Sequence, residues 1–352
     1  TLAQQRVEPT TLSPFTARQL VPGIHVLGTP PDYFGPVIGN ITVIEQRSGV
    51  VLIDSGGAVA DGRRVVAFVR SITDKPVTAV VVTHWHADHP AGVSAIRQAW
   101  PRSRVISTAT TRANLLGAGA QYLRTRPDSA MEVAVLNQFS AAIAQLQAAQ
   151  RAPGLDDATR QRIAGVIASY RARMSDIAGT HLVPPSETFT DRLLLDDPVN
   201  PVELRFLGRA NTDGDAIAWL PRQRIVVTGD VVVAPIPFGF FSYPADWIAV
   251  LERIKALQFA ILVPGHGQPQ TDTAYLDQLI GTLTDVRTQV AALAGQGLSL
   301  EQVREQADFS TQTAIFGATP RAAAAFRNFW LTPIVESAFR EARGEPITQG
   351  TD

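Results

Sequence analysis

The residues with the clearest capacity for chemistry lie in one heptapeptide, Thr83-His84-Trp85-His86-Ala87-Asp88-His89. Imidazole nitrogens and carboxylate oxygens are ligands that zinc accepts. His84 and His86 are two residues apart and can converge on one ion, whereas Asp88 and His89 project elsewhere and can begin a second site. The chain has 6 His in 352 residues, and half of them fall in this stretch. A chance cluster of this kind is rare, so we interpret the heptapeptide as a metal-binding loop.

The elements on either side must position this loop. Residues 77–82 form a short apolar, β-branched run bounded by Pro76, and such a run predicts a strand of a sheet that is covered on both faces. Residues 90–92 lead into a helical pattern that continues to Trp100. The sequence therefore predicts that the ligands lie on a loop at the end of a buried strand.

The pattern H-x-H-x-D-H at residues 84–89 resembles the metal-binding signature of the metallo-β-lactamase superfamily. Three later segments match that family in order and context, and each follows a predicted strand: residues 208–215, 228–230 and 264–267. The resemblance covers roughly residues 23–270 and implies an α/β fold, the αββα sandwich. It also implies that Asp230 is the carboxylate bridging two metal ions and that His266 is the last His ligand.

The resemblance implies two zinc sites, with one departure from the family pattern. Asn211 stands where relatives usually have the third His of site one, and an amide oxygen is a poorer ligand for zinc. Site two would keep a full protein set of ligands: Asp88, His89, His266 and the shared Asp230. Site one would keep His84, His86 and Asp230, with Asn211 as a weak or absent fourth ligand. We therefore predict that site two binds metal more tightly. Mononuclear iron oxygenases of the superfamily use the missing His, which argues against that activity.

The chemistry that this arrangement implies is hydrolysis. Zinc lowers the pKa of its bound water to about 7, so a zinc-bound hydroxide is available to attack a carbonyl carbon. We expect Asp88 to orient the hydroxide and Asn211 to polarise the carbonyl oxygen if site one is empty. The leading hypothesis is the opening of a cyclic amide or ester such as a β-lactam or lactone. The alternatives are another ester or thioester hydrolase, or a metal-poor, non-catalytic binding protein.

Aromatic residues near the motifs indicate a moderately hydrophobic small-molecule substrate. Residues 233–244 follow Asp230 almost at once and carry aromatics among prolines; these side chains either pack a long loop or line a pocket. The loop at residues 31–36 and the metal loop add further aromatic side chains. The expected substrate contacts are Trp85, Phe34, Phe238, Phe241 and Tyr243.

Three further residues are not assigned a catalytic or metal-binding role, and two of them, His25 and Asp54, are interpreted as structural. His25 lies within a predicted strand, and His181 has no ligand partner near it in the sequence, so we interpret it as non-catalytic. Asp54 resembles the Asp of the family's D-x-G turn. We expect it to be a buried carboxylate that caps backbone N–H groups near the metal loop.

Composition limits the classes of partner. The chain has a hydrophobic fraction of 45%, a charged fraction of 18% and a net charge of −1, which indicates a globular protein without a nucleic-acid partner. No apolar run is long enough to span a bilayer. Cys is absent, so metal ligands must be His and carboxylates. The first residue is Thr, and the polar, Pro-containing opening predicts a periplasmic or secreted protein, with the cytoplasm as the alternative.

The predicted elements divide the chain into an N-terminal extension at 1–22, a metallo-β-lactamase-like domain at 23–270 and a helical C-terminal extension at 271–352 packed on the same domain. Residues 111–180 show helical spacing broken at 151–154, which predicts an inserted helical hairpin. We favour packing on the core for this insertion, with a lid or a homodimer arm as alternatives. Strands are predicted at 24–27, 41–45, 50–53, 77–82, 105–107, 202–206, 216–220, 224–228 and 259–263.

Overall fold

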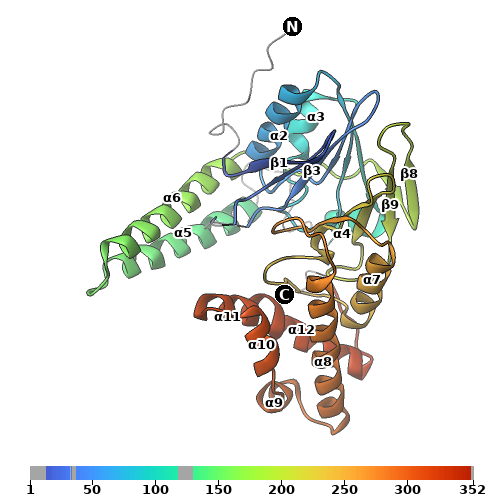
Figure 1. Cartoon of the computed structure of the whole chain (residues 1–352). Coiled ribbons are helices and arrows are strands. Elements are labelled where there is room, and N and C mark those ends of the chain that lie inside the picture. The colour runs from blue at the N-terminus through green and yellow to red at the C-terminus, as the bar shows by residue number, and fades with distance from the viewer. Residues whose placement is uncertain (1–12, 32, 34–36, 118–129, 350–352) are drawn as a thin grey trace. The chain divides into compact units, whose positions relative to one another are not determined.

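The computed structural model describes residues 13–31, 33, 37–117 and 130–349 (Figure 1). The chain forms two compact units. The first unit consists of Thr1–Val82, His86–Val105 and Leu115–Ser186, and the second of Thr83–Trp85, Ile106–Asn114 and Glu187–Asp352. The metal loop is thus divided between the units, and each unit is described by itself.

The first unit is built on strands that follow one another in chain order: β1 (Thr16–Val21), β2 (Ile24–Gly28), β3 (Ile41–Glu45), β4 (Val50–Ile53) and β5 (Val77–Val81). Neighbours pair antiparallel as far as β4, and β4 pairs parallel with β5. Every residue of β4 is buried. A buried parallel pair places the carboxyl ends of both strands at one edge of the sheet, and the chain leaves β5 there to enter the metal loop.

The helices of the first unit are α2 (Val59–Ile72), α3 (Val93–Ala99), α5 (Ala130–Gln150) and α6 (Asp157–Ile177). Figure 1 shows α5 and α6 lying side by side as a hairpin, and Phe139 packs edge-on against Tyr170 with ring centroids 5.3 Å apart. Asp156 begins α6 as its N-cap, since its side chain accepts a hydrogen bond from the Thr159 N–H.

Ion pairs connect α6 to α2. Arg64 donates two hydrogen bonds to the Asp176 carboxylate, at 2.9 and 3.0 Å. Arg173 Nη1 lies 2.7 Å from Asp61 Oδ2, and both side chains are almost fully buried. The inserted hairpin is therefore attached to the rest of the first unit by buried charge as well as by apolar contact.

The second unit contains the sheet with strand order β12-β11-β10-β9-β8. Its strands are β8 (Arg192–Leu195), β9 (Val202–Phe206), β10 (Ala216–Leu220), β11 (Ile225–Val227) and β12 (Ile261–Val263). β11 pairs parallel with β12, and the other pairs are antiparallel. The chain-order sheet continues with β6 (Arg104–Thr108) and ends with β7 (Glu187–Phe189). The last three residues of β6 belong to the second unit and pair there with β7 in parallel.

The core of the second unit forms where its helices meet this sheet. The helices are α7 (Pro244–Ala256), α8 (Ala274–Gly295), α9 (Leu300–Gln306), α10 (Ser310–Phe316), α11 (Pro320–Phe326) and α12 (Thr332–Arg343). A short π-helix, η3 (Arg327–Leu331), joins α11 to α12. Phe316, Phe326 and Trp330 stack in succession with ring centroids 4.9 and 5.2 Å apart. Aromatic burial of this kind contributes strongly to stability. α4 (Ala109–Leu116) runs from the second unit into the first.

The structure confirms the predicted strands and the inserted hairpin, and it contains three further strands. The sequence did not predict β1, β7 or β8. The first four residues of β1 are exposed, and β7 and β8 have only three and four residues. Ser299 begins α9 with a capping box, and Thr319 is the N-cap of α11, which begins at Pro320.

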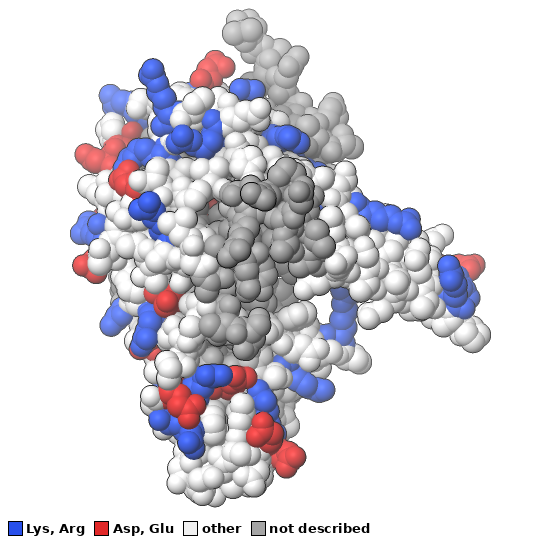
Figure 2. Space-filling model, turned by 180° about the vertical axis from the view of Figure 1, so that it is seen from behind, with Lys and Arg blue, Asp and Glu red and all other residues white. Residues whose placement is uncertain are grey.

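Charged side chains are spread over the surface. On the face drawn in Figure 2, Lys and Arg lie among Asp and Glu without a large patch of one sign. Within the described part of the chain, no helix has the length and apolar character needed to cross a membrane.

Candidate metal centre

In the second unit, two neighbouring parallel strands deliver a carboxylate and an imidazole to the same edge. β11 pairs with β12 in parallel register, with Val227 opposite Val263. Asp230 follows β11 within the short 3-10 helix η2 (Gly229–Val231), and His266 follows β12. A Cβ at Gly265 would lie 2.0 Å from Asp230 Oδ1, so glycine is required there for the turn after β12 to approach the carboxylate.

Each oxygen of the Asp230 carboxylate faces a different imidazole. His84 Nε2 lies 3.4 Å from Oδ2, and His266 Nε2 lies 3.4 Å from Oδ1. Hydrogen bonds between N and O are shorter, at about 2.7–3.2 Å. Two ligands of one tetrahedral zinc ion lie about 3.4 Å apart, because each is about 2.1 Å from the metal. The spacing therefore fits a carboxylate that shares one cation with each histidine.

Local contacts fix the orientation of His84. Its Nδ1 lies 3.0 Å from Thr83 Oγ1, which leaves Nε2 directed at Asp230. The Thr83 carbonyl accepts a hydrogen bond from the Ala216 N–H at 2.8 Å, so the start of the metal loop is held to β10. His84 is fully buried. A buried imidazole with one nitrogen held by a neighbour and the other aimed at a carboxylate is typical of a metal ligand.

Asn211 provides the observation that tests whether a cation fits here. Its side chain is fully buried, and neither the amide nitrogen nor the amide oxygen has a hydrogen-bond partner among the described residues. Buried amides are almost always satisfied, because leaving one unpaired costs about 1–3 kcal/mol. A cation, or a polar group of a substrate, is the kind of partner that such an amide requires. The residues present therefore fit a metal centre.

The turn that carries Asn211 is held by Asp215. Its carboxylate accepts hydrogen bonds from the Thr212 N–H at 2.7 Å and the Thr212 hydroxyl at 2.8 Å. Complete burial, against the lowering effect of these two bonds and with a smaller contribution from the negative charges of Asp230 and Asp213, raises the pKa of Asp215 to about 7. The sequence did not identify Asp215 as part of the site.

In the first unit, His89 is oriented by a second carboxylate. His89 Nδ1 lies 2.8 Å from Asp54 Oδ2, and both side chains are buried. The His89 carbonyl accepts hydrogen bonds from the Ser55 N–H and the Ser55 hydroxyl, each at 2.8 Å. The other ring nitrogen, His89 Nε2, lies 3.7 Å from Asp88 Oδ2. A carboxylate on the other nitrogen of a ligating histidine fixes its tautomer and raises its basicity.

The Asp54–His89 contact refines the role predicted for Asp54. The sequence predicted a buried structural carboxylate near the metal loop, and Asp54 is 2% exposed. Its observed partner is the imidazole of His89, which the sequence did not identify. Asp54 has a φ of 63°, a left-handed conformation that Asp tolerates better than most residues.

The aromatic residues predicted to contact substrate have different surroundings. Trp85 and Tyr243 are each 5% exposed; Trp85 Nε1 donates to Gln349 Oε1 at 3.0 Å, and Tyr243 Oη donates to the Ile347 carbonyl at 3.0 Å. Phe238 and Phe241 belong to an aromatic cluster that also includes Phe240 and Phe329. Phe34 lies outside the described residues.

The aromatic cluster, defined as Phe238, Phe240, Phe241 and Phe329, lies within the second unit. Phe238 is 5.1 Å from Phe240 and 6.5 Å from Phe329 between ring centroids. The Gly239 N–H donates to the Phe329 carbonyl at 3.0 Å, so the loop after Asp230 is held to η3. Phe329 is 52% exposed. A large apolar ring that stays in contact with water and has other aromatic rings next to it is a feature of hydrophobic ligand binding.

Comparison with known proteins places these features in a family. The family model described as the metallo-beta-lactamase superfamily matches residues 34–266. The linear primary-alkylsulfatase of Pseudomonas sp. (strain ATCC 19151) is 25% identical over 300 residues, which are 79% of this chain and 51% of that protein. The chain therefore spans about half the length of the curated relative that it matches.

Solved structures with the same fold include a stereoselective inverting sec-alkylsulfatase, Pisa1, from Pseudomonas sp., with a TM-score of 0.64 and 14% identity over 96% of this chain and 52% of that one. A metallo-β-lactamase from Pontibacter korlensis has a TM-score of 0.53 and 17% identity over 77% of this chain and 99% of that one. At these identities the likeness shows the fold. It confirms the predicted αββα fold with a helical C-terminal region.

Proposed function

Because the chain belongs to the metallo-β-lactamase superfamily, we propose that it is a zinc-dependent hydrolase whose ligands come from the motifs identified in the sequence. The observation that carries this proposal is the Asp230 carboxylate, whose two oxygens each lie 3.4 Å from the Nε2 atom of a different histidine. A structural ion pair would be expected to close to hydrogen-bond distance. Shared cations explain the longer spacing.

The proposal assigns two sites. Site one would take His84, His86 and Asp230, with Asn211 as its weak or absent fourth ligand. Site two would take Asp88, His89, His266 and the shared Asp230. When bound, the cations would supply Lewis acidity and make water nucleophilic near neutral pH.

The side chains of this chain would orient and polarise the reactants. Asp54 holds Nδ1 of His89 at 2.8 Å, so Nε2 is the nitrogen that would ligate the metal. Asp88 is half-buried and would accept a hydrogen bond from the attacking water. Asn211 has an unpaired amide group that could donate a hydrogen bond to an oxygen of the substrate as negative charge develops on it.

The substrate class that we propose is an ester of sulfuric acid with an aliphatic alcohol. The support is the 25% identity to a linear primary-alkylsulfatase and the partly exposed aromatic cluster, which can hold an apolar chain. Water would be consumed, the ester would be cleaved, and an alcohol and hydrogensulfate would be released. Cyclic amides and esters are the class expected from the sequence, and the experiment below includes them as a second candidate substrate class.

A substrate panel tests this proposal. Purified protein with added zinc would be given octyl sulfate, a chromogenic β-lactam, a lactone and a thioester, and released sulfate or ring opening would be measured. The expected result is zinc-dependent release of sulfate that Asp88→Asn abolishes while the fold is kept. Turnover of the β-lactam or lactone alone would reject the sulfate ester as the substrate class but support the assignment as a zinc-dependent hydrolase. Absence of zinc-dependent turnover with every substrate would reject both.

Three further features remain predictions. One is the division of the chain into an N-terminal extension at 1–22, a metallo-β-lactamase-like domain at 23–270 and a helical C-terminal extension at 271–352. The others are the homodimer, which gel filtration coupled to light scattering measures directly, and the periplasmic or secreted location.

A further inference from the structure

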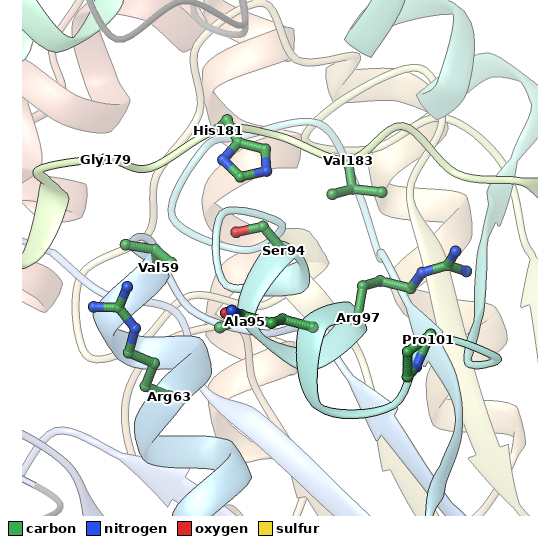
Figure 3. A pocket seen from close by; sticks show the side chains of 10 residues that line it. Val59, Arg63, Ser94, Ala95, Arg97, Pro101, Gly179, His181 and Val183 are labelled. Atoms are coloured by element: carbon green, nitrogen blue, oxygen red, sulfur yellow. The ribbon is translucent and has the colours of Figure 1, made fainter.

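The first unit contains a cleft of ≈ 550 Å³ that the proposed hydrolysis does not use (Figure 3). Its walls come from the start of α2, from α3 and the turn after it, and from the segment following α6. The lining residues are Val59, Arg63, Ser94, Ala95, Arg97, Gln98, Pro101, Gly179, His181 and Val183. None of these is a metal ligand proposed above.

The cleft is lined by basic groups without acidic ones. Arg63, Arg97 and His181 contribute cationic or hydrogen-bond-donating groups, and none of the lining residues is Asp or Glu. Arg97 Nη1 donates to the Ser103 carbonyl at 2.6 Å, which leaves its positive charge without a carboxylate. Arg63 takes part in none of the ion pairs or hydrogen bonds between described residues. Its neighbour Arg64, in contrast, is paired with Asp61 and Asp176. The cleft therefore carries positive charge that no described side chain neutralises.

A buried hydroxyl lies at the floor of the cleft. Ser94 is 8% exposed, and its Oγ has no hydrogen-bond partner in the described part of the chain. Figure 3 shows the Ser94 side chain beneath the His181 ring, with Arg63 and Arg97 on opposite sides of the view. Serine hydroxyls can rotate to meet a partner, and a buried one without a partner is uncommon. An acceptor held in the cleft would satisfy it.

We propose that this cleft binds a small oxyanion, with Arg63 and Arg97 supplying charge and Ser94 and His181 supplying hydrogen bonds. Guanidinium groups recognise sulfate, phosphate and carboxylate oxygens with charge-assisted hydrogen bonds. The exposed position of Arg63 and His181 leaves the cleft open to solvent, so the ligand can exchange freely. The anion is either a free inorganic ion or the anionic group of a small organic molecule.

His181 gives a direct way to observe binding. The imidazole signals of the 6 His would be recorded by NMR while sodium sulfate, sodium phosphate or sodium acetate is added at constant ionic strength. Assignment would use His181→Gln. The proposal expects a saturable shift of the His181 signal with at least one of these anions. If the saturable shift of the His181 signal is larger with acetate than with sulfate or phosphate, the ligand is the carboxylate of an organic molecule.

Matched substitutions test which residues hold the anion. Arg63→Gln and Arg97→Gln should each weaken binding about tenfold or more, and Ser94→Ala about threefold or more, as expected for charged and neutral hydrogen bonds respectively. Arg102→Gln is the control, because Arg102 is exposed, follows lining residue Pro101 and lies outside the cleft. It removes the same charge and should leave the dissociation constant unchanged.

Two results would overturn the proposal. One is a His181 signal that moves linearly with anion concentration without saturating. The other is an equal loss of affinity in Arg63→Gln and Arg102→Gln, which would mean that net charge alone attracts the anion. Both readouts measure binding in the full chain, so they stand whether or not the protein hydrolyses any ester. Arg63→Gln should also leave zinc content at its wild-type level.

Discussion

The buried ion pair between Arg173 and Asp61 offers the sharpest test of how the inserted hairpin is attached. Arg173 lies on α6 and Asp61 on α2, with exposed side-chain fractions of 3% and 0%. Asp61 Oδ2 also accepts a hydrogen bond from the Gly57 N–H at 2.9 Å. A Cβ at Gly57 would lie 2.6 Å from Arg173 Nη2 and 2.8 Å from Asp88 Cα. Gly57 is thus packed against both Arg173 and the backbone of Asp88.

The perturbation is Arg173→Met, which keeps an apolar stem and removes the guanidinium. Burial raises the pKa of Asp61, and the adjacent Arg173 is the strongest influence that lowers it, so removing Arg173 leaves a buried charge poorly compensated. Breaking a buried pair costs about 3–5 kcal/mol. Arg64 Nη1, at 3.1 Å from Asp61 Oδ1, remains to offset part of the loss. We therefore expect the low end, about 3 kcal/mol.

Urea unfolding followed by fluorescence measures this loss. With a slope of about 1–3 kcal/mol/M for a domain of this kind, the midpoint should fall by about 1–3 M. The double variant Asp61→Asn, Arg173→Met removes both charges and should be about 1–3 kcal/mol more stable than the sum of the single effects predicts. Arg171→Met, at an exposed position on the same helix, should change stability by less than about 0.5 kcal/mol.

Additive effects of the two substitutions would refute this reasoning, because independent residues do not couple. So would a loss in Arg173→Met no larger than that in Arg171→Met. Either result would mean that apolar contact alone attaches α6.

Three other predictions concern the candidate metal centre. Asn211→His should tighten zinc binding at site one by supplying an imidazole ligand, and a competition titration with a chromophoric chelator would measure it; unchanged affinity would place residue 211 outside that site. Asp54→Ala should weaken zinc binding about 10–100-fold by releasing His89 Nδ1, whereas Asp54→Asn, which keeps an acceptor, should lose less; equal losses would contradict the hydrogen-bond account. The pKa of Asp215 is raised to about 7 from 3.8, so the folded metal-free protein holds this proton more tightly than the unfolded chain. Its contribution to the free energy of unfolding should therefore fall by up to about 4 kcal/mol as the pH rises from about 4 to 7. Asp215→Asn should flatten that decline in urea unfolding at pH 5 and 8 with chelator present, and an unaltered slope would be evidence against the burial of a titrating Asp215.

The sequence predicted those helices and strands that are specified by their own residues. The β-branched run before the metal loop predicted β5, and helical spacing broken at 151–154 predicted the hairpin of α5 and α6. In contrast, β1 is mostly exposed, and β7 and β8 are very short. Such strands are stabilised by the neighbour they pair with, which a local pattern does not contain.

The same distinction applies to the candidate site. Residue type and family order identified His84, Asp230 and His266, and the structure brings these three together in the second unit. The contact of Asp54 with His89 and that of Phe238 with Phe329 join residues far apart in the sequence. No spacing rule predicts such pairs, because they depend on how strands and helices pack. Asp215 was missed for a related reason: its burial, and not its position in a motif, makes it unusual.

The measurement that tests the central claim most directly is the zinc content of the wild-type chain and of Asp230→Ala after dialysis, determined by plasma mass spectrometry. If Asp230 shares one cation with each histidine, the wild type should hold zinc at site two and, less tightly, at site one, and Asp230→Ala should lose affinity at both. His266→Ala should weaken site two alone. An Asp230→Ala protein that keeps the wild-type zinc content would contradict the assignment of Asp230 as the bridging ligand.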